Sequence, residues 1–383
     1  MCGIYIHIPF CKQACYYCDF HFSTSLKKKD ELIKALVKEI ELRKNEINEI
    51  NESIETIYFG GGTPSLLSIN ELQLLIDTVY KNYNVIDAPE ITLEANPDDL
   101  SKQKLNDLTT SRINRLSIGI QSFFEDELQS MNRAHSAKEA KDCLSVATCH
   151  FDNITIDLIY GFPNMSIEKW NENLQIAFSF GINHISSYAL TVEPRTALST
   201  FIKRGTYPPI NEALALQHFN HLVEETKKHG FIHYEISNFG KSNYFSKHNT
   251  SYWLGKSYLG IGPSAHSFNG TQRSWNVANN IKYIKSLQDN KLPNTVETLS
   301  KQDQYNEYIM TGLRTIWGIS LNKIETEFGL KYKSHLLASA KKFINQELLM
   351  LEDCHAERSR SILKATQKGK FLIDGIASNL FKI

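Results

Sequence analysis

Three cysteines near the start of the chain have the spacing of metal ligands. Cys11, Cys15 and Cys18 form the pattern C-x3-C-x2-C, directly after an alternating stretch at residues 4–8 that predicts a β-strand. Iron–sulfur clusters are normally held by four protein ligands, so three cysteines would leave one iron of a [4Fe-4S] cluster open to another molecule. A structural zinc ion would require four closed ligands, and a disulfide would use only two of the three thiols. The pattern therefore favours an iron–sulfur cluster, with zinc as the alternative.

A glycine-rich stretch could bind a ligand through its backbone. Residues 60–63, Gly-Gly-Gly-Thr, follow a predicted strand and precede an apolar helical pattern. Glycine allows the backbone to approach a bound molecule closely and to present N–H and C=O groups to it. The stretch lacks the Lys-Ser/Thr pair of a phosphate-binding loop. Gly61, Gly62 and Thr63 are therefore candidate binding residues, and a tight turn between strand and helix is the alternative.

The elements that must position these residues alternate between strands and helices. The predicted strands are residues 4–8, 54–59, 90–95, 116–120, 154–160 and 184–191. Apolar helical patterns between them predict right-handed crossovers and a parallel sheet. Two further units, which a complete eight-fold barrel would need, are not apparent. The sequence therefore predicts an α/β fold with an open six-stranded parallel (β/α)6 partial barrel.

Polar residues gather at the carboxyl ends of these strands, where such folds bind ligands. Glu94 ends the third predicted strand and Gln121 the fourth. Asp157 lies in the fifth strand, and Arg133 stands in the segment after the fourth. For Arg133 a surface ion pair is the alternative, and for Asp157 a capping or core carboxylate.

The chain divides into three predicted parts. Residues 1–210 form the partial barrel with the cysteine loop, and residues 211–300 form a linking region that contains the string His-Asn-x-x-Tyr-Trp at 248–253 and a Gly-rich stretch at 258–267. Residues 301–383 carry helical patterns followed by a short hairpin, which predicts a mainly helical, winged-helix-like domain. Within that hairpin, the polar and basic residues 354–361 predict an exposed insertion.

Composition excludes several classes of function. The chain has 42 Lys and Arg against 42 Asp and Glu, so its net charge of zero gives no argument for nucleic acid. No run of about 18 apolar residues is present, so we expect no membrane span. The chain enters a strand at once, so we also expect no signal peptide. Seven cysteines lack the density of a secreted disulfide scaffold, and the expected compartment is the reducing cytoplasm.

The cysteine pattern after a first strand resembles the radical SAM superfamily, in which S-adenosyl-L-methionine chelates the open iron. The longer string at residues 5–20, YIHIPFC…C..CDF, resembles one branch of it, the relatives of oxygen-independent coproporphyrinogen III oxidase. The oxidases carry a fourth cysteine two residues after the third, where this chain has Phe20. The haem chaperones of the branch are therefore the closer match.

The resemblance implies roles for individual residues. The glycine motif would hold the methionine amino group, and an aromatic at Tyr17 would cover the adenine. The remaining residues that would contact S-adenosyl-L-methionine are Tyr5, Glu94, Gln121, Arg133, Asp157 and the backbone of Ala189. His248, in the His-Asn-x-x-Tyr-Trp string, would contact haem; the alternative is an ordinary loop whose His and Trp pack against the barrel.

Two functions follow from this resemblance. The first is a haem chaperone that holds a [4Fe-4S] cluster and S-adenosyl-L-methionine, binds haem, and passes it to haem-requiring apoproteins, respiratory enzymes among them. A homodimer and a transient visit to the membrane surface are compatible with that role. The second is the oxidative decarboxylation of coproporphyrinogen III by radical chemistry, which Phe20 disfavours. Cleavage of S-adenosyl-L-methionine is compatible with both functions.

Overall fold

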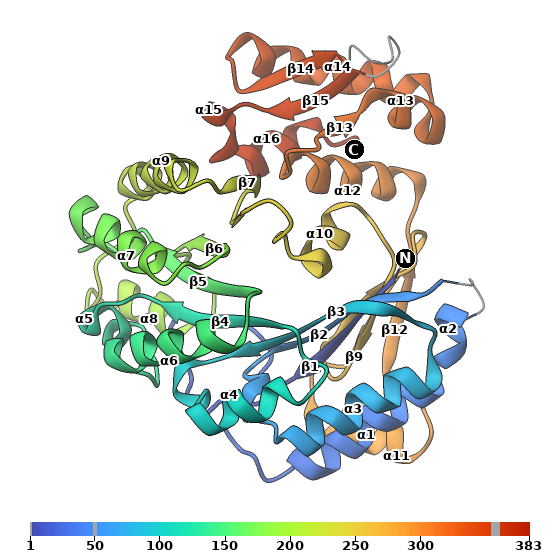
Figure 1. Cartoon of the computed structure of the whole chain (residues 1–383). Coiled ribbons are helices and arrows are strands. Elements are labelled where there is room, and N and C mark those ends of the chain that lie inside the picture. The colour runs from blue at the N-terminus through green and yellow to red at the C-terminus, as the bar shows by residue number, and fades with distance from the viewer. Residues whose placement is uncertain (1, 49–51, 354–360) are drawn as a thin grey trace.

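One curved, open sheet organises the chain (Figure 1). The computed structural model describes residues 2–48, 52–353 and 361–383. Over these residues the sheet has 12 strands in the order β12-β11-β10-β9-β1-β2-β3-β4-β5-β6-β8-β7. Its parallel strands are β1 (Cys2–Ile8), β2 (Ile54–Gly61), β3 (Val85–Ala95), β4 (Arg115–Gln121), β5 (Ile154–Tyr160), β6 (His184–Ala189) and β9 (Tyr258–Ile261). The α/β class and the parallel sheet are thus as predicted.

The number of strands differs from the prediction. All six predicted strands are present, but β9 adds a seventh parallel strand by pairing with β1, with Gly3 opposite Tyr258. Antiparallel strands extend both edges: β7 (Ile232–Glu235) and β8 (Asn238–Gly240) beyond β6, and β10 (His266–Phe268), β11 (Gln272–Asn276) and β12 (Asn294–Thr298) beyond β9. β9 has only four residues. A strand this short leaves no periodic pattern, and its partner is more than 250 residues away in the chain.

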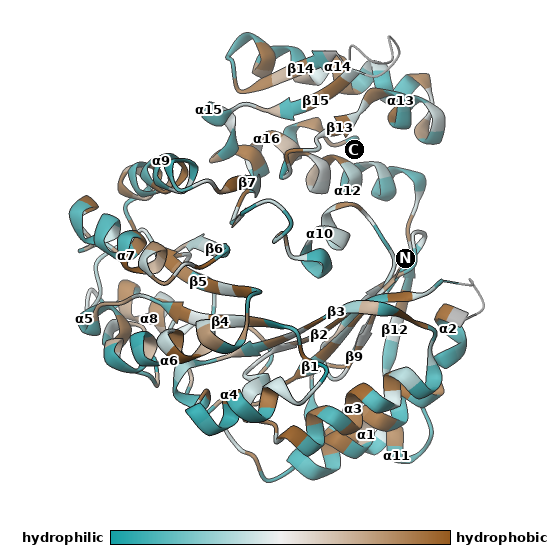
Figure 2. Cartoon of the chain, in the orientation of Figure 1, coloured by the Kyte–Doolittle hydropathy of each residue, from teal (hydrophilic) through white to brown (hydrophobic). Residues whose placement is uncertain are grey.

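Helices cover the outer face of the parallel strands. They are α1 (Lys29–Leu42), α3 (Ile69–Asn82), α4 (Lys102–Thr109), α6 (Ala137–His150) and α7 (Ile167–Ser179). In α3, Leu72, Leu75, Ile76 and Val79 recur at helical spacing and are fully buried, and Ser68 and Glu71 form a capping box at its start. Figure 2 shows the resulting hydrophobic sides of the helices turned toward the sheet. The other helices of this part are α2 (Lys44–Asn48), α5 (Glu125–Ser130), α8 (Ala197–Lys203), α9 (Glu212–Lys228), α10 (Lys247–Trp253) and α11 (Asn280–Gln288).

The C-terminal residues form a mainly helical domain with its own hydrophobic cluster. Its elements are α12 (Lys301–Leu313), β13 (Ile319–Ser320), α13 (Leu321–Lys323), a π-helical turn (Ile324–Phe328), α14 (Leu330–Asn345), β14 (Leu349–Asp353), β15 (Ser361–Ala365), α15 (Gln367–Lys370) and α16 (Ile373–Leu380). Helices followed by a hairpin, with β15 between β13 and β14 in a small sheet, match the predicted winged-helix-like order. The predicted insertion at 354–361 lies outside the described residues except for its last position.

The predicted boundaries at 210 and 300 stay a prediction. Strands β7 to β12, which fall between them, belong to the same sheet as the first 210 residues.

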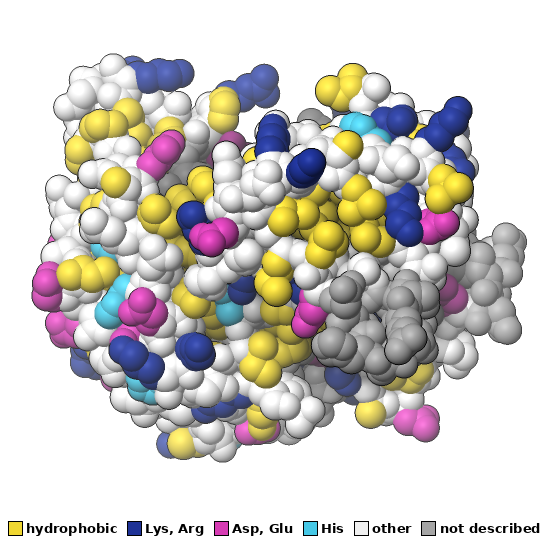
Figure 3. Space-filling model, turned by 90° about the horizontal axis from the view of Figure 1, so that it is seen from above, with side chains coloured by type: hydrophobic (Ala, Val, Ile, Leu, Met, Phe, Trp, Pro, Cys, Tyr) yellow, Lys and Arg dark blue, Asp and Glu magenta, His cyan; other side chains and the backbone are white. Residues whose placement is uncertain are grey.

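The face seen in Figure 3 carries hydrophobic side chains mixed with basic and acidic ones, as the balanced composition suggests. None of the helices in the described parts of the chain is long and apolar enough to cross a bilayer.

Candidate functional site

The cysteine loop follows β1 and is hydrogen-bonded to a segment that comes much later in the chain. The amide of Gln13 donates to Asn132 Oδ1 at 2.6 Å, and Asn132 Nδ2 donates to the carbonyl of Ala14 at 2.8 Å. The backbone N–H of Tyr16 donates to the carbonyl of Met131 at 3.1 Å. The segment after α5 therefore holds the middle of the loop in place.

Arg133, in that same segment, reaches the cysteines. Its Nη1 lies 3.5 Å from Cys15 Sγ and 3.4 Å from the Tyr17 hydroxyl. Its Nη2 donates to Asn96 Oδ1 at 2.7 Å and to the carbonyl of Gly119 at 2.8 Å. Its buried Nε has no hydrogen-bond partner among the described residues. The structure thus brings together three residues that the sequence singled out separately, and leaves one donor of the guanidinium unused.

The thiols fit a metal cluster by their chemistry. Cys11, Cys15 and Cys18 are half-buried on one loop. Burial raises the pKa of Cys18 to about 11 and also raises that of Cys11. Both are thiols at neutral pH, so a metal must displace their protons when it binds. Among the described residues no three His, Cys, Asp or Glu side chains converge on a point for a single metal ion.

The glycine loop packs directly against the start of the cysteine loop. The N–H of Gly62 donates to the carbonyl of Ile8 at 2.9 Å, and that of Thr63 to the carbonyl of Phe10 at 2.7 Å. A Cβ atom at Gly62 would lie 2.6 Å from the Phe10 carbonyl oxygen, and Gly61 has a φ of +112°. Both positions therefore require glycine. Asn96 Nδ2 donates to Thr63 Oγ1 at 3.2 Å, so Asn96 joins the glycine loop to Arg133.

Two carboxyl groups lie in the interior of the partial barrel. Glu94 accepts hydrogen bonds from the Tyr58 hydroxyl at 2.7 Å and from the Gly61 N–H at 3.2 Å, and burial raises its pKa. Asp157 is half-buried on β5, and burial together with the nearby Glu94 raises its pKa to about 7. A positive group entering this space would be attracted to both carboxylates.

The remaining predicted contacts lie along the same rim. Gln121 is buried at the end of β4 and has a φ of +64°, which is uncommon for a residue with a side chain. Tyr5, on β1, has its hydroxyl 3.2 Å from His7 Nδ1. Ala189 is the last residue of β6 and is paired with Tyr160. We call this rim group the mouth: the three cysteines, Tyr5, Tyr17, 61–63, Glu94, Gln121, Arg133, Asp157 and Ala189.

His248 lies elsewhere, in a group of buried polar side chains below the mouth. It is 1% exposed, its Nδ1 is 2.7 Å from Thr56 Oγ1, and its Nε2 is 2.7 Å from the Tyr252 hydroxyl. Its ring stacks on that of Tyr58 with the centroids 4.8 Å apart, and burial lowers its pKa to about 3. Both ring nitrogens are therefore engaged within the protein. The alternative interpretation of a His packed against the barrel describes this geometry, and haem ligation would require the ring to give up a hydrogen bond.

The neighbours of His248 are equally enclosed. Glu90 accepts from the backbone N–H groups of Lys247 and His248, at 3.0 Å each, and lies 3.9 Å from Arg115 Nε. Arg115 is 1% exposed and also bonds the Thr155 hydroxyl, which is 3.0 Å from His184 Nδ1. We call this group, Thr56, Glu90, Arg115, Thr155, His184 and His248, the floor.

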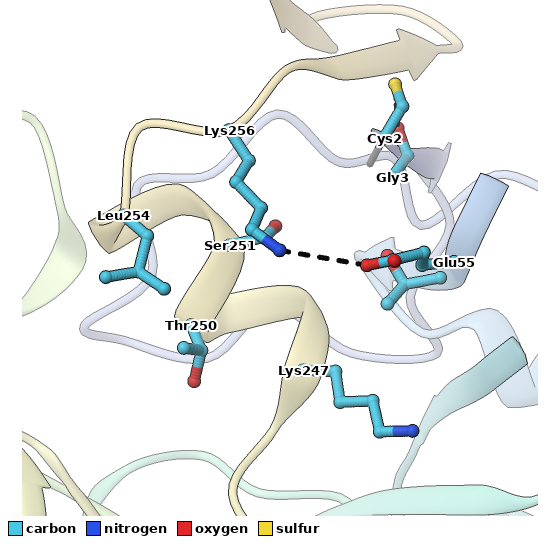
Figure 4. Close-up of a pocket in the computed structure, with 9 residues that line it drawn as sticks. Cys2, Gly3, Glu55, Lys247, Thr250, Ser251, Leu254 and Lys256 are labelled. Atoms are coloured by element: carbon cyan, nitrogen blue, oxygen red, sulfur yellow. Dashed lines mark hydrogen bonds and ion pairs between the residues drawn. The ribbon is translucent and has the colours of Figure 1, made fainter. Parts of the chain in front are cut away.

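A small cavity lies on the far side of the floor, against α10 and the starts of β1 and β2 (Figure 4). Its volume is about 160 Å³, and its lining includes Cys2, Thr56, Lys247 and Thr250. Lys256 reaches across it toward Glu55, at 3.8 Å. It is separate from the mouth, because it opens at the amino ends of the strands.

Sequence reasoning missed two residues that hold side chains of the mouth in place. Asn96 links Thr63 to Arg133, and Tyr58 holds Glu94. The Asn-Pro step that ends β3 was a signal for Asn96. No local signal marks Tyr58, because successive strand residues point to opposite faces and the sequence of β2 does not say which face lines the barrel interior.

Comparisons with known proteins find relatives along nearly the whole chain. A model described as the radical SAM superfamily matches residues 5–177, and one described as the HemN C-terminal domain matches residues 299–372. Proteins named heme chaperone HemW are similar over most of their length. That of Lactococcus lactis is 33% identical over 383 residues and that of Bacillus subtilis 32% over 382, each alignment covering 97% of both chains. That of Buchnera aphidicola from Acyrthosiphon pisum is 36% identical over 319 residues, which is 82% of both chains.

A solved structure has the same fold. The coproporphyrinogen III oxidase HemN of Escherichia coli, a radical SAM enzyme, superposes with a TM-score of 0.83 at 21% identity. The superposition covers 100% of this chain and 90% of that chain. The predicted resemblance is thus confirmed: the chain belongs to the radical SAM superfamily and, within it, to the family of the heme chaperone HemW.

Proposed function

We propose that this chain is a haem chaperone: it binds a [4Fe-4S] cluster, S-adenosyl-L-methionine and haem, and transfers the haem to apoproteins that require it. The observation that carries the proposal is similarity along nearly the whole chain to proteins named heme chaperone HemW. The oxidase, by contrast, shares the fold at 21% identity. Phe20, where the oxidases have a fourth cysteine, points the same way.

The mouth would hold the first two groups. Cys11, Cys15 and Cys18 would ligate three irons, and the glycine loop and Arg133 would hold the amino and carboxylate groups of S-adenosyl-L-methionine. When bound, such a cluster supplies one electron at low potential to the sulfonium. The role of the chain itself is to fix the loop through Asn132 and to offer carboxylates, at Glu94 and Asp157, to the positive or hydroxyl-bearing parts of the ligand.

The other parts of the proposal follow from the same family. Haem and haem-accepting apoproteins would be the partners, and respiratory enzymes would be among the acceptors. A reducing compartment, the cytoplasm, suits a cluster on a half-exposed loop. The predicted haem contact at His248 stays a prediction. Its buried ring is hydrogen-bonded at both nitrogens, so contact with the iron would require one of these hydrogen bonds to break.

One anaerobic experiment tests the proposal. The reconstituted protein would receive S-adenosyl-L-methionine and a reductant, then either coproporphyrinogen III or haem. A shifted Soret band with haem, haem delivery to an apo-cytochrome and no protoporphyrinogen formation are the expected results. Protoporphyrinogen formation would contradict the proposal and assign oxidase activity. The amount of 5′-deoxyadenosine would show whether S-adenosyl-L-methionine is cleaved or only held.

A further inference from the structure

A second cleft lies between the barrel and the C-terminal domain, away from the mouth. It has a volume of about 370 Å³, and we call it the α10 cleft. Its walls come from α10, from the strands β9, β10 and β11 with the turn after β10, and from α12, α13 and the turn after α13. Figure 1 shows α10 facing α12 across this region. The lining residues that matter below are Tyr252, Trp253, Tyr258, Arg273, Tyr308 and Lys323.

Aromatic side chains dominate the lining. Tyr252 and Tyr258 meet edge to face with the ring centroids 4.4 Å apart, and Phe268 lies 6.2 Å beyond Tyr258. Trp253 is half-buried, with the guanidinium of Arg314 5.0 Å from its ring centroid. Such surfaces bind flat conjugated molecules through the ring faces and edges. Aromatic rings from both the barrel and the C-terminal domain contribute, so a ligand here would touch both.

Two half-exposed cations stand beside these rings. Arg273 is 43% exposed and pairs with Glu307 at 2.7 Å, while Lys323 is 41% exposed and lies 3.9 Å from Glu327. Lys323 Nζ is also 4.5 Å from the centroid of the Tyr308 ring. Glu307 and Glu327 also line the cleft, so an entering carboxylate would replace them as partners of the two cations. Neither cation is buried, so each can turn toward that carboxylate at little desolvation cost. The exposure also shows that the cleft opens to solvent, which allows a larger planar molecule to project from it.

His248 contributes to this cleft only through Tyr252. Its Nε2 is bonded to the Tyr252 hydroxyl, so the imidazole orients a ring that lines the cleft. Among the side chains that line the cleft there is no His, Cys or Met. Tyrosinate can also ligate haem iron, but burial raises the pKa of all three tyrosines of the lining, Tyr252, Tyr258 and Tyr308, and so disfavours the phenolate. A planar ligand would therefore be recognised by its faces and its carboxylates, and not by a strong axial bond to a metal at its centre.

We propose that the α10 cleft binds a planar tetrapyrrole that carries carboxylate groups, with Arg273 and Lys323 pairing with the carboxylates and His248 acting as a positioning residue. This inference rests on the proposed haem-chaperone function and gives it a place in the molecule. It also gives the C-terminal domain a role, because Tyr308 and Lys323 belong to it.

The test compares a metal-bound and a metal-free ligand. The reconstituted full-length chain would be titrated with ferric haem and, separately, with metal-free protoporphyrin IX, followed by absorbance and fluorescence. Because no axial bond is needed, the wild-type chain should bind both with dissociation constants within about threefold of each other. Binding of haem alone, without protoporphyrin, would overturn the inference and assign the contact to an iron ligand such as His248.

Variants locate the site. The double variant Arg273→Gln/Lys323→Gln should bind both molecules at least about tenfold more weakly, since each lost cation removes a charge-assisted contact. The matched control is Arg112→Gln/Lys138→Gln, which removes two surface cations far from the cleft and should bind as the wild type. Unchanged cluster absorption would show that each variant is folded. Wild-type affinity in the cleft variant would overturn the inference, whereas a wild-type chain that binds neither molecule would overturn the proposed function itself.

Discussion

The mouth and the floor are both polar groups inside one partial barrel, yet they differ in how far their side chains are enclosed. In the floor, both nitrogens of His248 and both oxygens of Glu90 have partners, and the side chains are fully buried. In the mouth, the cysteines and Asp157 are half-exposed. Arg133 Nε in the mouth and Arg115 Nε in the floor both lack a hydrogen-bond partner among the described residues, so exposure and not bonding separates the two groups. An enclosed network stabilises a fold, whereas a ligand can reach one that is partly exposed.

This contrast changes the interpretation of the His-Asn-x-x-Tyr-Trp string. The sequence marked His248 as a candidate haem contact, but the structure places it in the floor. The part of the string that reaches an open surface is Tyr252 and Trp253, which line the α10 cleft. A motif can therefore be split, with one residue holding the fold and another facing a ligand.

The largest effect that we expect is at the mouth. Cys11→Ala, Cys15→Ala or Cys18→Ala should each abolish the brown absorption of the cluster after anaerobic reconstitution, because too few thiolates remain. Iron, sulfide and the visible spectrum measure the loss. Cys149→Ala is the control, since Cys149 is exposed on α6. A cysteine variant of the loop that kept a full cluster would remove the basis for calling the mouth a cluster site.

The next effect is on the stability of the floor. Arg115→Met should lower the free energy of unfolding by about 3 kcal/mol, because it leaves Glu90 charged and buried without its cation. Denaturant unfolding of the cluster-free chain measures the change. Arg112→Met, on the surface three positions earlier, should have little effect. Equal stability of both variants would mean that the buried ion pair contributes nothing to the fold.

A smaller effect is expected at His248. His248→Gln keeps a polar side chain but cannot reproduce both ring hydrogen bonds, so we expect a loss of about 1–3 kcal/mol in stability. Haem affinity should stay within about threefold of the wild type if the ring only positions Tyr252. A stable variant that had lost haem binding would reverse this assignment and return His248 to the binding surface.

The last prediction concerns the pH dependence of the mouth. The raised pKa of Asp157, about 7, means that the folded chain holds its proton more tightly than the unfolded chain does. Stability should therefore fall as the pH rises from about 4 to about 7, and Asp157→Asn should flatten that part of the curve. Urea midpoints at about pH 5 and about pH 7.5 measure the difference, with Asp142→Asn on the surface of α6 as the control. A variant with the slope of the wild type would show that Asp157 does not titrate in this range.

Several features of the fold could be predicted because they are local. Residues that are close together in the sequence determine the strand and helix periodicities, the turns after the strands and the spacing of three cysteines within eight positions. The six central strands and the helical C-terminal domain followed from them. β9 could not be predicted, because four residues are too few to show a strand periodicity and because it pairs with β1, which is distant in the sequence.

The sequence by itself determined which residue types were available and which strand ends they occupied. Only the tertiary structure decided which of them meet. Arg133 and Cys15 are 118 positions apart, and His248 and Thr56 are 192 apart, so packing of the sheet brings each pair together. Burial is likewise a property of the whole fold, and it is burial that leaves His248 neutral and enclosed while the cysteines stay accessible.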